Sequence, residues 1–507
     1  IDTSFVTQLT TLKTPIMGNL YQDVFYFSLP WWVVWEHAKE FWGENPTGAW
    51  AQTVEYAVPK IKVTTNKAVD VHSILQHMGW TTRNIAYEGT ALILRTYLEV
   101  WNYWFRDKTV TAPILYSKGD ADVTYDGSSI YGGTLLNVCR FHDRYSSGLP
   151  EPQAGSAEII SLGTTANLND TNLNVKTANS DLINGTHYGM FLRKGDGTDL
   201  ETNQYNVYVQ GNTYGTGLLD AQNSTSSQGT GTAIYPSNLY VSTAGATVDL
   251  TTAVSATINA LRVDVALQHI KEKDAIFGNY YANITQAHWG VIGNSDILQI
   301  AEYLGGKRVP LNITTVLQTS ATDSTSPQGW ATGYSKTGDA DHSFTKSFTV
   351  HSIILGVTCI RQDHQYAQGL PVQFCKFRKY DYYWNELAGV GYQAIPKKQL
   401  YITGDPTVDE QTFAYQQPWQ EYRCWDNMVT GEINPDYAQS LDYWSLVDDY
   451  SSAPVFSTEW LEEKPDYLDR ALQVQSSAQD QFLCDFAVDI TKISEVPLYG
   501  IPGITKL

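Results

Sequence analysis

Cysteine, charge and long apolar runs are all scarce in this chain of 507 residues. The cysteines are odd in number, widely separated and without a CxxC pair. This pattern excludes a disulfide framework and a zinc site and indicates reduced thiols. The longest apolar run, Ile353 to Ile360, is about ten residues too short to cross a bilayer, so no membrane span is expected. The five cysteines are Cys139, Cys359, Cys375, Cys424 and Cys484.

Positively charged residues are scarcer than negatively charged ones. The chain has 33 Lys and Arg against 53 Asp and Glu, which gives a formal net charge of −20. A protein that binds duplex DNA by neutralising phosphates needs an excess of positive charge, so the composition argues against that class. It favours a soluble particle, or a partner that brings its own positive charge.

Aromatic residues are plentiful: 15 Trp, 33 Tyr and 16 Phe favour half-buried strands over helices. The run Val24 to Phe27 predicts a buried strand that stops at Pro30. Apolar residues at helical spacing predict helices over Leu92 to Phe105 and Ala253 to Asp274. The segment Ala321 to Asp341 is predicted to be rich in turns. Further strands are predicted at Leu311 to Leu317, Ser347 to Ile360, Val372 to Phe377 and Gln399 to Ile402.

These elements predict a mainly β protein with a few helices and long loops. No repeat with a period of about 20–50 residues is present, which disfavours propellers and solenoids. A double-sheet jelly roll with large insertions fits the pattern.

A polar segment from Pro150 to about Val254 interrupts the aromatic chain. In Gly211 to Thr230, 13 of 20 residues are Gly, Ser, Thr or Asn, and no strand or helix period is visible. Such a stretch buries too little apolar surface to order itself alone, and large polar loops on a rigid scaffold often contact external partners. Four tyrosines in it are candidate aromatic anchors for such a contact, and the resemblance given below implies that the partner is a host cell. They are Tyr188, Tyr205, Tyr208 and Tyr214.

Residues that suggest catalysis or metal binding are few. Asp120, Asp122 and Asp126 resemble part of a calcium loop, but Tyr131 stands where an EF-hand needs Glu, so a solvated turn is favoured. Four acidic or histidine pairs are better explained by structural hydrogen bonds or surface charge than by an active site, because no nucleophile or metalloprotease motif accompanies them. The pairs are His142-Asp143, Asp363-His364, Asp448-Asp449 and Glu462-Glu463. We therefore expect no enzyme activity, metal or cofactor.

One cluster interleaves cations with aromatic residues. Lys376, Arg378 and Lys379 alternate with Phe377 and Tyr380, a composition suited to touching phosphates and stacking bases. These three cations are the candidate DNA-facing residues. The alternative, a strand end with basic side chains that reach past it into solvent, is the more common situation.

Dense motifs spread over nearly the whole chain resemble, in their order, the major capsid proteins of the Microviridae, the small single-stranded-DNA phages, and the gokushovirus branch in particular. No single motif is specific for this family, but the motifs together, in the same order, are. The motifs include Phe25-Tyr26-Phe27-Ser28-Leu29-Pro30, Trp101-Asn102, Trp104-Phe105-Arg106-Asp107, Arg140-Phe141-His142-Asp143-Arg144-Tyr145, Ala301-Glu302-Tyr303-Leu304-Gly305-Gly306, Trp419-Gln420-Glu421-Tyr422-Arg423 and Pro497-Leu498-Tyr499-Gly500-Ile501-Pro502-Gly503. Departures at Pro30-Trp31-Trp32, His351-Ser352 and Gly391-Tyr392-Gln393 affect local contacts.

The resemblance implies an eight-stranded antiparallel jelly roll of the viral capsid type, assembled into a T=1 icosahedral shell around circular single-stranded DNA. Residues 157–252 lie where that branch carries an insertion that forms protrusions at the three-fold axes. Implied partners are further copies of the chain, the DNA genome, a small basic packaging protein, other phage structural proteins and a bacterial surface receptor. The implied location is the virion, after assembly in the bacterial cytoplasm, which suits reduced cysteines.

Four residues are the predicted packing and assembly anchors: Trp101, Trp104, Phe105 and Arg106. Aromatic and Arg side chains dominate association energies in interfaces. If the Trp104 indole is fully buried, its loss is predicted to cost about 3–5 kcal/mol.

Two other functions remain open on the residues alone. A secreted carbohydrate-binding or carbohydrate-cleaving β-protein would explain the aromatic content and the acidity. A phage receptor-binding protein would explain the polar insertion.

Overall fold

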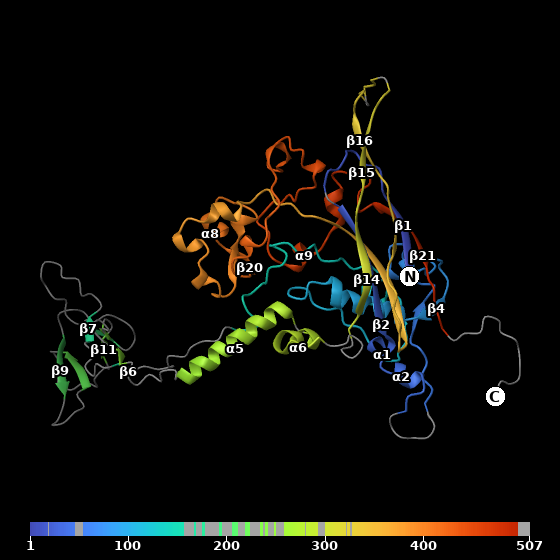
Figure 1. The fold of residues 1–507 in the computed structure, drawn as a ribbon. Coiled ribbons are helices and arrows are strands. Elements are labelled where there is room, and N and C mark those ends of the chain that lie inside the picture. The colour runs from blue at the N-terminus through green and yellow to red at the C-terminus, as the bar shows by residue number, and fades with distance from the viewer. Residues whose placement is uncertain are drawn as a thin grey trace, which may run out of the picture. The chain divides into compact units, whose positions relative to one another are not determined.

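The computed structural model describes residues 1–18, 20–45, 54–156, 258–278, 280–292, 300–320, 322–324 and 327–494 (Figure 1). Between residues 157 and 257 it describes only the backbone of short strands. The chain divides into two compact units. One comprises Ile1–Ser156 with His269–Leu507, and the other is Ala157–Gln268.

The first unit has a three-stranded antiparallel sheet with β2 (Leu20–Pro30) at its centre. β2 pairs with β14 (Glu302–Pro310) on one side and with β18 (Ser352–Gln362) on the other. Because β2 has a strand on each side, nearly all of its residues are buried. The predicted strand at Val24 to Phe27 is confirmed, and Pro30 is its last residue.

A second antiparallel sheet places β1 (Asp2–Leu9) between β17 (Thr337–His342) and β21 (Phe482–Asp489). Residues of β1 alternate between exposed and buried, the pattern of a strand with one face on a core. Thr3 of this strand shares a 2.6 Å hydrogen bond with the hydroxyl of Tyr26 in β2. This contact ties the two sheets together.

Two hairpin strands, β15 (Ile313–Leu317) and β16 (Ala331–Ser335), pair antiparallel beside these sheets. The strand predicted at residues 311–317 is confirmed. The prediction that residues 321–341 are rich in turns is wrong over their second half, because β16 and the start of β17 lie there. Thr and Gly residues in that segment resemble turn composition, but their pairing partners lie elsewhere in the chain.

The helix predicted over residues 92–105 is confirmed. It begins as α4 (Leu92–Val100) and continues as a π-helical turn, η1 (Trp101–Phe105). Leu92, Val100, Trp101 and Phe105 belong to the same buried cluster as Phe27 and Leu29 of β2. The apolar face of the helix therefore covers the β2 sheet.

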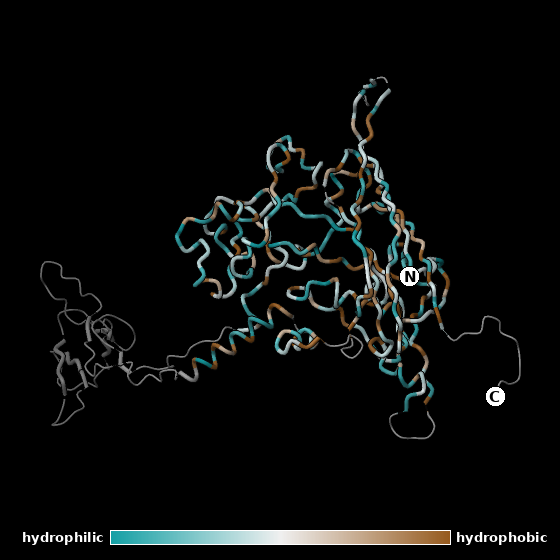
Figure 2. Tube along the Cα trace, in the orientation of Figure 1, coloured by the Kyte–Doolittle hydropathy of each residue, from teal (hydrophilic) through white to brown (hydrophobic). Residues whose placement is uncertain are grey.

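Two further helices are α5 (Ile258–Phe277) and α6 (Tyr281–Trp289). The helix predicted over residues 253–274 is confirmed from Ile258 onward, and residues 253–257 lie outside the described part of the chain. Hydrophilic and hydrophobic residues alternate along α5 (Figure 2). None of the helices in the described residues is long and apolar enough to cross a membrane.

The remaining elements of the first unit are short. Val372–Cys375 and Lys397–Gln399 form single 3₁₀ turns, so the strands predicted at residues 372–377 and 399–402 are wrong. Apolar residues are present at both places, but no strand among the described residues pairs with them. The other short elements are α1 (Trp31–Val34), α2 (Ala38–Phe41), β3 (Lys60–Val63), α3 (Ile74–His77), β4 (Tyr87–Thr90), β5 (Val123–Thr124), β19 (Gln393–Pro396), α8 (Pro406–Asp409), β20 (Thr412–Gln416) and α9 (Thr458–Leu461).

The described residues of the second unit form four nested antiparallel strand pairs. The innermost pair is β9 (Tyr205–Gln210) with β10 (Leu218–Asn223). β10 lies within Gly211 to Thr230, where the sequence predicted no strand, so that prediction is wrong. The outer pairs are β8 (Leu192–Lys194) with β11 (Ile234–Pro236), β7 (Val175–Thr177) with β12 (Leu239–Val241), and β6 (Asn167–Leu168) with β13 (Val248–Asp249).

A mainly β fold with few helices is therefore confirmed. In the described residues each sheet holds two or three strands. A single eight-stranded jelly roll stays a prediction.

Candidate functional site

The predicted packing anchors lie at the end of the helix over the β2 sheet. Trp101 is 6% exposed and Phe105 is 8% exposed, and the Trp101 indole N–H donates to the backbone oxygen of Asn137 at 2.8 Å. Trp104 differs, because 43% of it is exposed although its ring lies 5.5 Å from that of Phe27. Two of the three aromatic anchors thus pack inside the subunit, and only Trp104 offers a surface to a neighbour.

Arg106 follows the π-helical turn and closes it. Its Nε donates to the backbone oxygen of Asn102 at 3.1 Å, and Nη1 donates to the backbone oxygen of Thr111. The guanidinium therefore satisfies carbonyl groups at the helix end, as cations at a helix C-terminus commonly do. It also fixes the loop that follows the helix.

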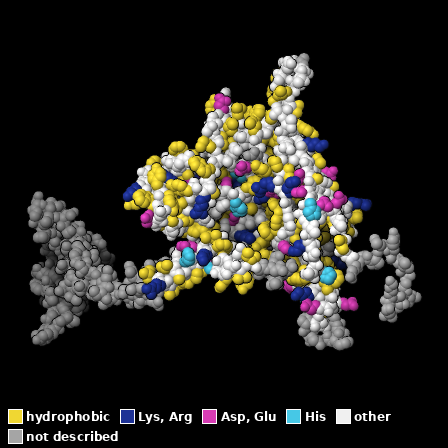
Figure 3. All heavy atoms as spheres, in the orientation of Figure 1, with side chains coloured by type: hydrophobic (Ala, Val, Ile, Leu, Met, Phe, Trp, Pro, Cys, Tyr) yellow, Lys and Arg dark blue, Asp and Glu magenta, His cyan; other side chains and the backbone are white. Residues whose placement is uncertain are grey.

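The three candidate DNA-facing cations lie in a region rich in exposed aromatic side chains. We call this region the aromatic patch. Phe377 is 79% exposed and Trp425 is 83% exposed. Hydrophobic side chains gather over the part of the chain that contains α8 (Figure 3). The exposed aromatic residues of the patch are Phe374, Phe377, Tyr380, Tyr382, Tyr383, Trp384, Tyr422 and Trp425.

Lys376 is not a free cation. Its Nζ lies 3.0 Å from Glu421 Oε1, donates to the Tyr422 hydroxyl at 3.2 Å, and lies 4.3 Å from the centre of the Tyr422 ring. Burial alone would lower the pKa of Lys376, but the bonds to Glu421 and Tyr422 outweigh it and raise that pKa. Lys376 thus holds two segments of the patch together.

Arg378 and Lys379 are more available. Lys379 Nζ lies over the rings of Trp384 and Tyr380, at 4.8 and 5.6 Å, and among the described residues neither cation forms an ion pair. Asp381 accepts bonds from the backbone N–H groups of Phe377 and Arg378, which lower the pKa of its carboxyl group. The alternative of a strand end with solvated basic side chains is wrong about the strand, because a 3₁₀ turn precedes the cluster, but Arg378 and Lys379 are exposed as it expects.

The residues considered as acid–base pairs include three that meet inside the fold. His364 Nδ1 lies 2.9 Å from Asp448 Oδ2, and His364 Nε2 lies 3.1 Å from Glu463 Oε2. All three side chains are buried, and Arg140 Nη1 lies 3.5 Å from the same Asp448 oxygen. Burial by itself lowers the pKa of His364, but Asp448 and Glu463 outweigh it and raise the pKa to about 9.

This buried charge network, formed by Arg140, His364, Asp448 and Glu463, links segments far apart in the sequence. His364 is doubly protonated at neutral pH and therefore donates from both ring nitrogens. A histidine held in this form between two carboxylates is not a free base. Nearby, Asp143 accepts from the hydroxyl of Tyr366 at 2.6 Å. The prediction of structural hydrogen bonding by Asp143 and His364 is confirmed, whereas the interpretation of Asp448 and Glu463 as surface charge is wrong, because both are buried.

Asp23 forms a second buried charge cluster that sequence analysis did not find. It lies in β2, is 1% exposed, and accepts bonds from Arg308 and Arg361. The ring of Phe141 lies between the two guanidinium groups, 3.9 Å from the carbon of Arg308 and 4.2 Å from that of Arg361. A lone acid inside an apolar strand was the available signal, because a buried charge requires a partner.

The three carboxylates of the calcium-like segment have separate partners. Asp120 accepts from the Trp35 indole at 2.7 Å, Asp122 pairs with Lys62 at 2.8 Å, and Asp126 accepts from the backbone N–H of Ser128. In the part of the chain that the structure describes, no group of three His, Cys, Asp or Glu side chains is arranged so that it could hold a metal ion.

Of the four candidate host-contact tyrosines, Tyr188 and Tyr214 lie outside the described residues. Tyr205 and Tyr208 lie on β9, where their backbones pair with Asn223 and Asp220.

Comparison with known proteins identifies relatives of nearly full length. A family model described as "Capsid protein (F protein)" matches residues 1–504. The chain is 29% identical to capsid protein VP1 of Spiroplasma virus 4 over 524 residues, which covers 100% of this chain and 90% of that protein. It is 30% identical to capsid protein VP1 of Chlamydia phage 1, over 99% of this chain and 89% of that protein. Capsid protein VP1 of Bdellovibrio phage phiMH2K is 29% identical, also over 99% and 89%.

Proposed function

Since the chain belongs to the capsid protein (F protein) family, within the gokushovirus branch of the Microviridae, we propose that its copies close into a T=1 icosahedral shell around circular single-stranded DNA. The protein is a structural capsid protein, and the family's role is not enzymatic. The match of the family model to residues 1–504 carries this conclusion. This match excludes the alternative of a secreted carbohydrate-binding or carbohydrate-cleaving protein.

We propose that the two three-stranded sheets, β17-β1-β21 and β14-β2-β18, are the two halves of a jelly-roll core. Both are antiparallel, and Phe5 of the first packs with Val24 and Tyr26 of the second in one buried cluster. Face-to-face antiparallel sheets are the layer arrangement of a jelly roll. Negative-stain imaging of the purified protein, with closed shells expected, tests the assembly itself.

Within such a shell, the aromatic patch is suited to hold the single-stranded DNA. Exposed rings such as Phe377 and Trp425 offer stacking faces, and Arg378 and Lys379 supply positive charge beside them. Stacking of bases on aromatic side chains tolerates any sequence, which packaging of a whole genome requires. Because the chain carries a net charge of −20, a small basic packaging protein and other phage structural proteins are expected partners for the rest of the DNA.

The patch makes a direct prediction for DNA binding. The double variant Phe377→Ala with Trp425→Ala is expected to weaken binding of a labelled oligothymidylate at low salt by roughly tenfold or more, since each stacked base contributes about 1–3 kcal/mol. Fluorescence anisotropy with purified subunits measures the loss. Trp330→Ala, which removes another exposed indole (54% exposed), is the matched control and should leave binding unchanged. Equal binding by the double variant and the wild type would refute this role.

We propose that residues 157–252 form the surface insertion at the three-fold axes and contact a receptor on the bacterial host. Their separation as part of a distinct compact unit, Ala157–Gln268, supports this assignment. Within this unit the strand pairs are nested, so that its first and last strands, β6 and β13, pair with each other. Tyr188, Tyr205, Tyr208 and Tyr214 are the proposed aromatic anchors, and the cations Lys176, Arg193 and Lys194 are too few for DNA binding.

Replacing Gly211 to Thr230 with a short Gly-Ser linker tests this role. The change removes β10, the partner of β9, so the tip of the insertion is lost while the outer strand pairs remain. We expect intact, DNA-filled particles that no longer adsorb to host cells. Shortening the β15–β16 connection at residues 322–328 is the control and should leave adsorption normal. Failed assembly would instead indicate that the insertion buttresses neighbouring subunits, and normal adsorption would exclude host contact.

A further inference from the structure

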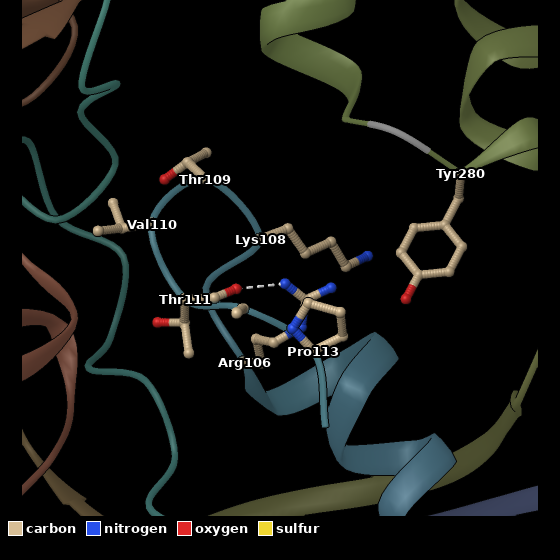
Figure 4. Close-up of a pocket in the computed structure, with 8 residues that line it drawn as sticks. Arg106, Lys108, Thr109, Val110, Thr111, Pro113 and Tyr280 are labelled. Carbon is tan, nitrogen blue, oxygen red and sulfur yellow. Dashed lines mark hydrogen bonds between the residues drawn. The ribbon is translucent and has the colours of Figure 1, made fainter. Parts of the chain in front are cut away.

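A pocket of about 460 Å³ lies beside the loop that follows the π-helical turn. Residues 106 and 108–113 form one side of it and Tyr280, just before α6, forms the other. Arg106, Lys108 and Tyr280 reach into the same space from these two sides (Figure 4). The pocket is separate from the aromatic patch described above.

The pocket is positively charged in an acidic protein. Among the described residues that line it, two are cations, Arg106 and Lys108, and none is a carboxylate. The nearest acid in sequence, Asp107, is turned away into its own loop, where it accepts from the backbone N–H groups of Thr109 at 2.8 Å and Val110 at 3.3 Å. Its charge therefore stabilises the loop and does not occupy the pocket.

Arg106 keeps part of its donor capacity free. Its Nε and Nη1 donate to the backbone oxygens of Asn102 and Thr111, which fixes the plane of the guanidinium. Among the described residues, Nη2 donates to no protein atom. A fixed guanidinium with unused N–H groups is a preorganised donor for an oxyanion.

Lys108 is held in place without a counter-ion. Its Nζ lies 3.9 Å from the centre of the Tyr103 ring and 4.7 Å from that of Tyr280, and it forms no ion pair with any described residue. Burial and the neighbouring Arg106 lower the pKa of Lys108 to about 8, against a smaller opposing effect of Asp107. A negative charge beside Lys108 would oppose both causes and favour its protonated form.

We propose that this pocket binds a phosphate-type oxyanion between Arg106 and Lys108, either as inorganic phosphate or as a phosphodiester of a nucleic-acid strand. The Arg fork and the Lys ammonium are the two side chains that most commonly bind phosphate. The volume leaves room for more than the anion alone, and the Tyr280 ring offers a face for an attached sugar or base. The nucleic-acid form of the site rests on the proposed function.

Binding of inorganic phosphate and of a short oligothymidylate to the purified full-length chain, measured by calorimetry at low salt, tests the proposal. Lys108→Met keeps the aliphatic stem between the two rings and removes the charge, and we expect it to weaken binding of both probes by about tenfold or more. Lys464→Met removes a lysine that pairs with Glu459 on the surface and should change neither affinity. Equal affinity of Lys108→Met and wild type for both probes would overturn the site.

A second measurement needs no variant. An amine-acylating reagent at pH 8 should modify Lys108 readily, and added phosphate should slow this modification because the bound anion keeps the amine protonated and covered. Mass spectrometry of Lys108 and Lys464 peptides gives the two rates in one sample. If saturating phosphate leaves the labelling rate of Lys108 unchanged, the proposal is contradicted. It is also contradicted if Lys108 is protected from the reagent only when the chain self-associates.

The two sources of the anion give different results. Tighter binding of the oligothymidylate than of phosphate, with competition between them, identifies the phosphodiester, whereas binding of phosphate alone identifies the free ion. Loss of oligothymidylate binding in the aromatic-patch variant but not in Lys108→Met would leave the DNA role standing and refute this pocket as its site. Phosphate binding that depends on Lys108, without any oligothymidylate binding, would support the pocket and refute the DNA role.

Discussion

Replacing Trp101 with alanine is expected to destabilise the unassembled subunit by about 3–5 kcal/mol. The indole is 6% exposed and belongs to the cluster that joins the helix to the β2 sheet. Its removal leaves a large cavity and deprives the backbone oxygen of Asn137 of its donor. Urea denaturation followed by circular dichroism measures the loss as a shift of the midpoint at an unchanged slope.

Trp104→Ala is the matched control, three residues further along the same helix. The exposed fraction of Trp104 is 43%, so the condition under which the sequence predicted a loss of about 3–5 kcal/mol is not met. We expect about 1–2 kcal/mol, from the contact with Phe27 and the hydrogen bond to the backbone oxygen of Ala301. Equal losses for the two variants would show that Trp101 is not the main anchor of this helix.

Asp448→Ala is expected to cost a similar amount, about 3–5 kcal/mol, because it leaves the positive charges of His364 and Arg140 without their central partner. The neighbouring variant Asp449→Ala provides the control. Asp449 is exposed and accepts one hydrogen bond at 3.3 Å, from Gln368, so its loss should cost less than about 1 kcal/mol.

The buried charge network also predicts a pH dependence. The pKa of His364 is about 9 in the folded chain and 6.5 as its ordinary value. Because the folded state raises this pKa, the stabilisation is fully present below pH 6.5 and is lost as the pH rises through about 9. The change amounts to roughly 3 kcal/mol in the free energy of unfolding.

Unfolding curves between pH 6 and pH 10 measure this change. In Asp448→Ala the slope should be much smaller, since the main charge that raises the pKa of His364 is gone. A wild-type stability that stays constant over this range would contradict the assignment of a protonated His364.

The sequence by itself determined the features that depend on local pattern and composition. Apolar residues at helical spacing predicted the helix over residues 92–105, and the run from Val24 predicted a buried strand, which the structure places at the centre of a three-stranded sheet. The order of short motifs identified the capsid family, because a family match is itself a property of the linear chain. Where local composition is ambiguous, a local pattern can mislead. At residues 372–377 it predicted a strand, but the chain forms a 3₁₀ turn there.

Only the tertiary structure decided how charged side chains are paired. Asp23 meets Arg361 across 338 residues of sequence, and His364 meets Asp448 across 84. No periodicity encodes such separations, since they arise when distant strands and loops pack and each buried charge must find a counter-charge. For the same reason Lys376, a candidate DNA contact in the sequence, is neutralised by Glu421, while Lys108, at the edge of a pocket, forms no ion pair with any described residue.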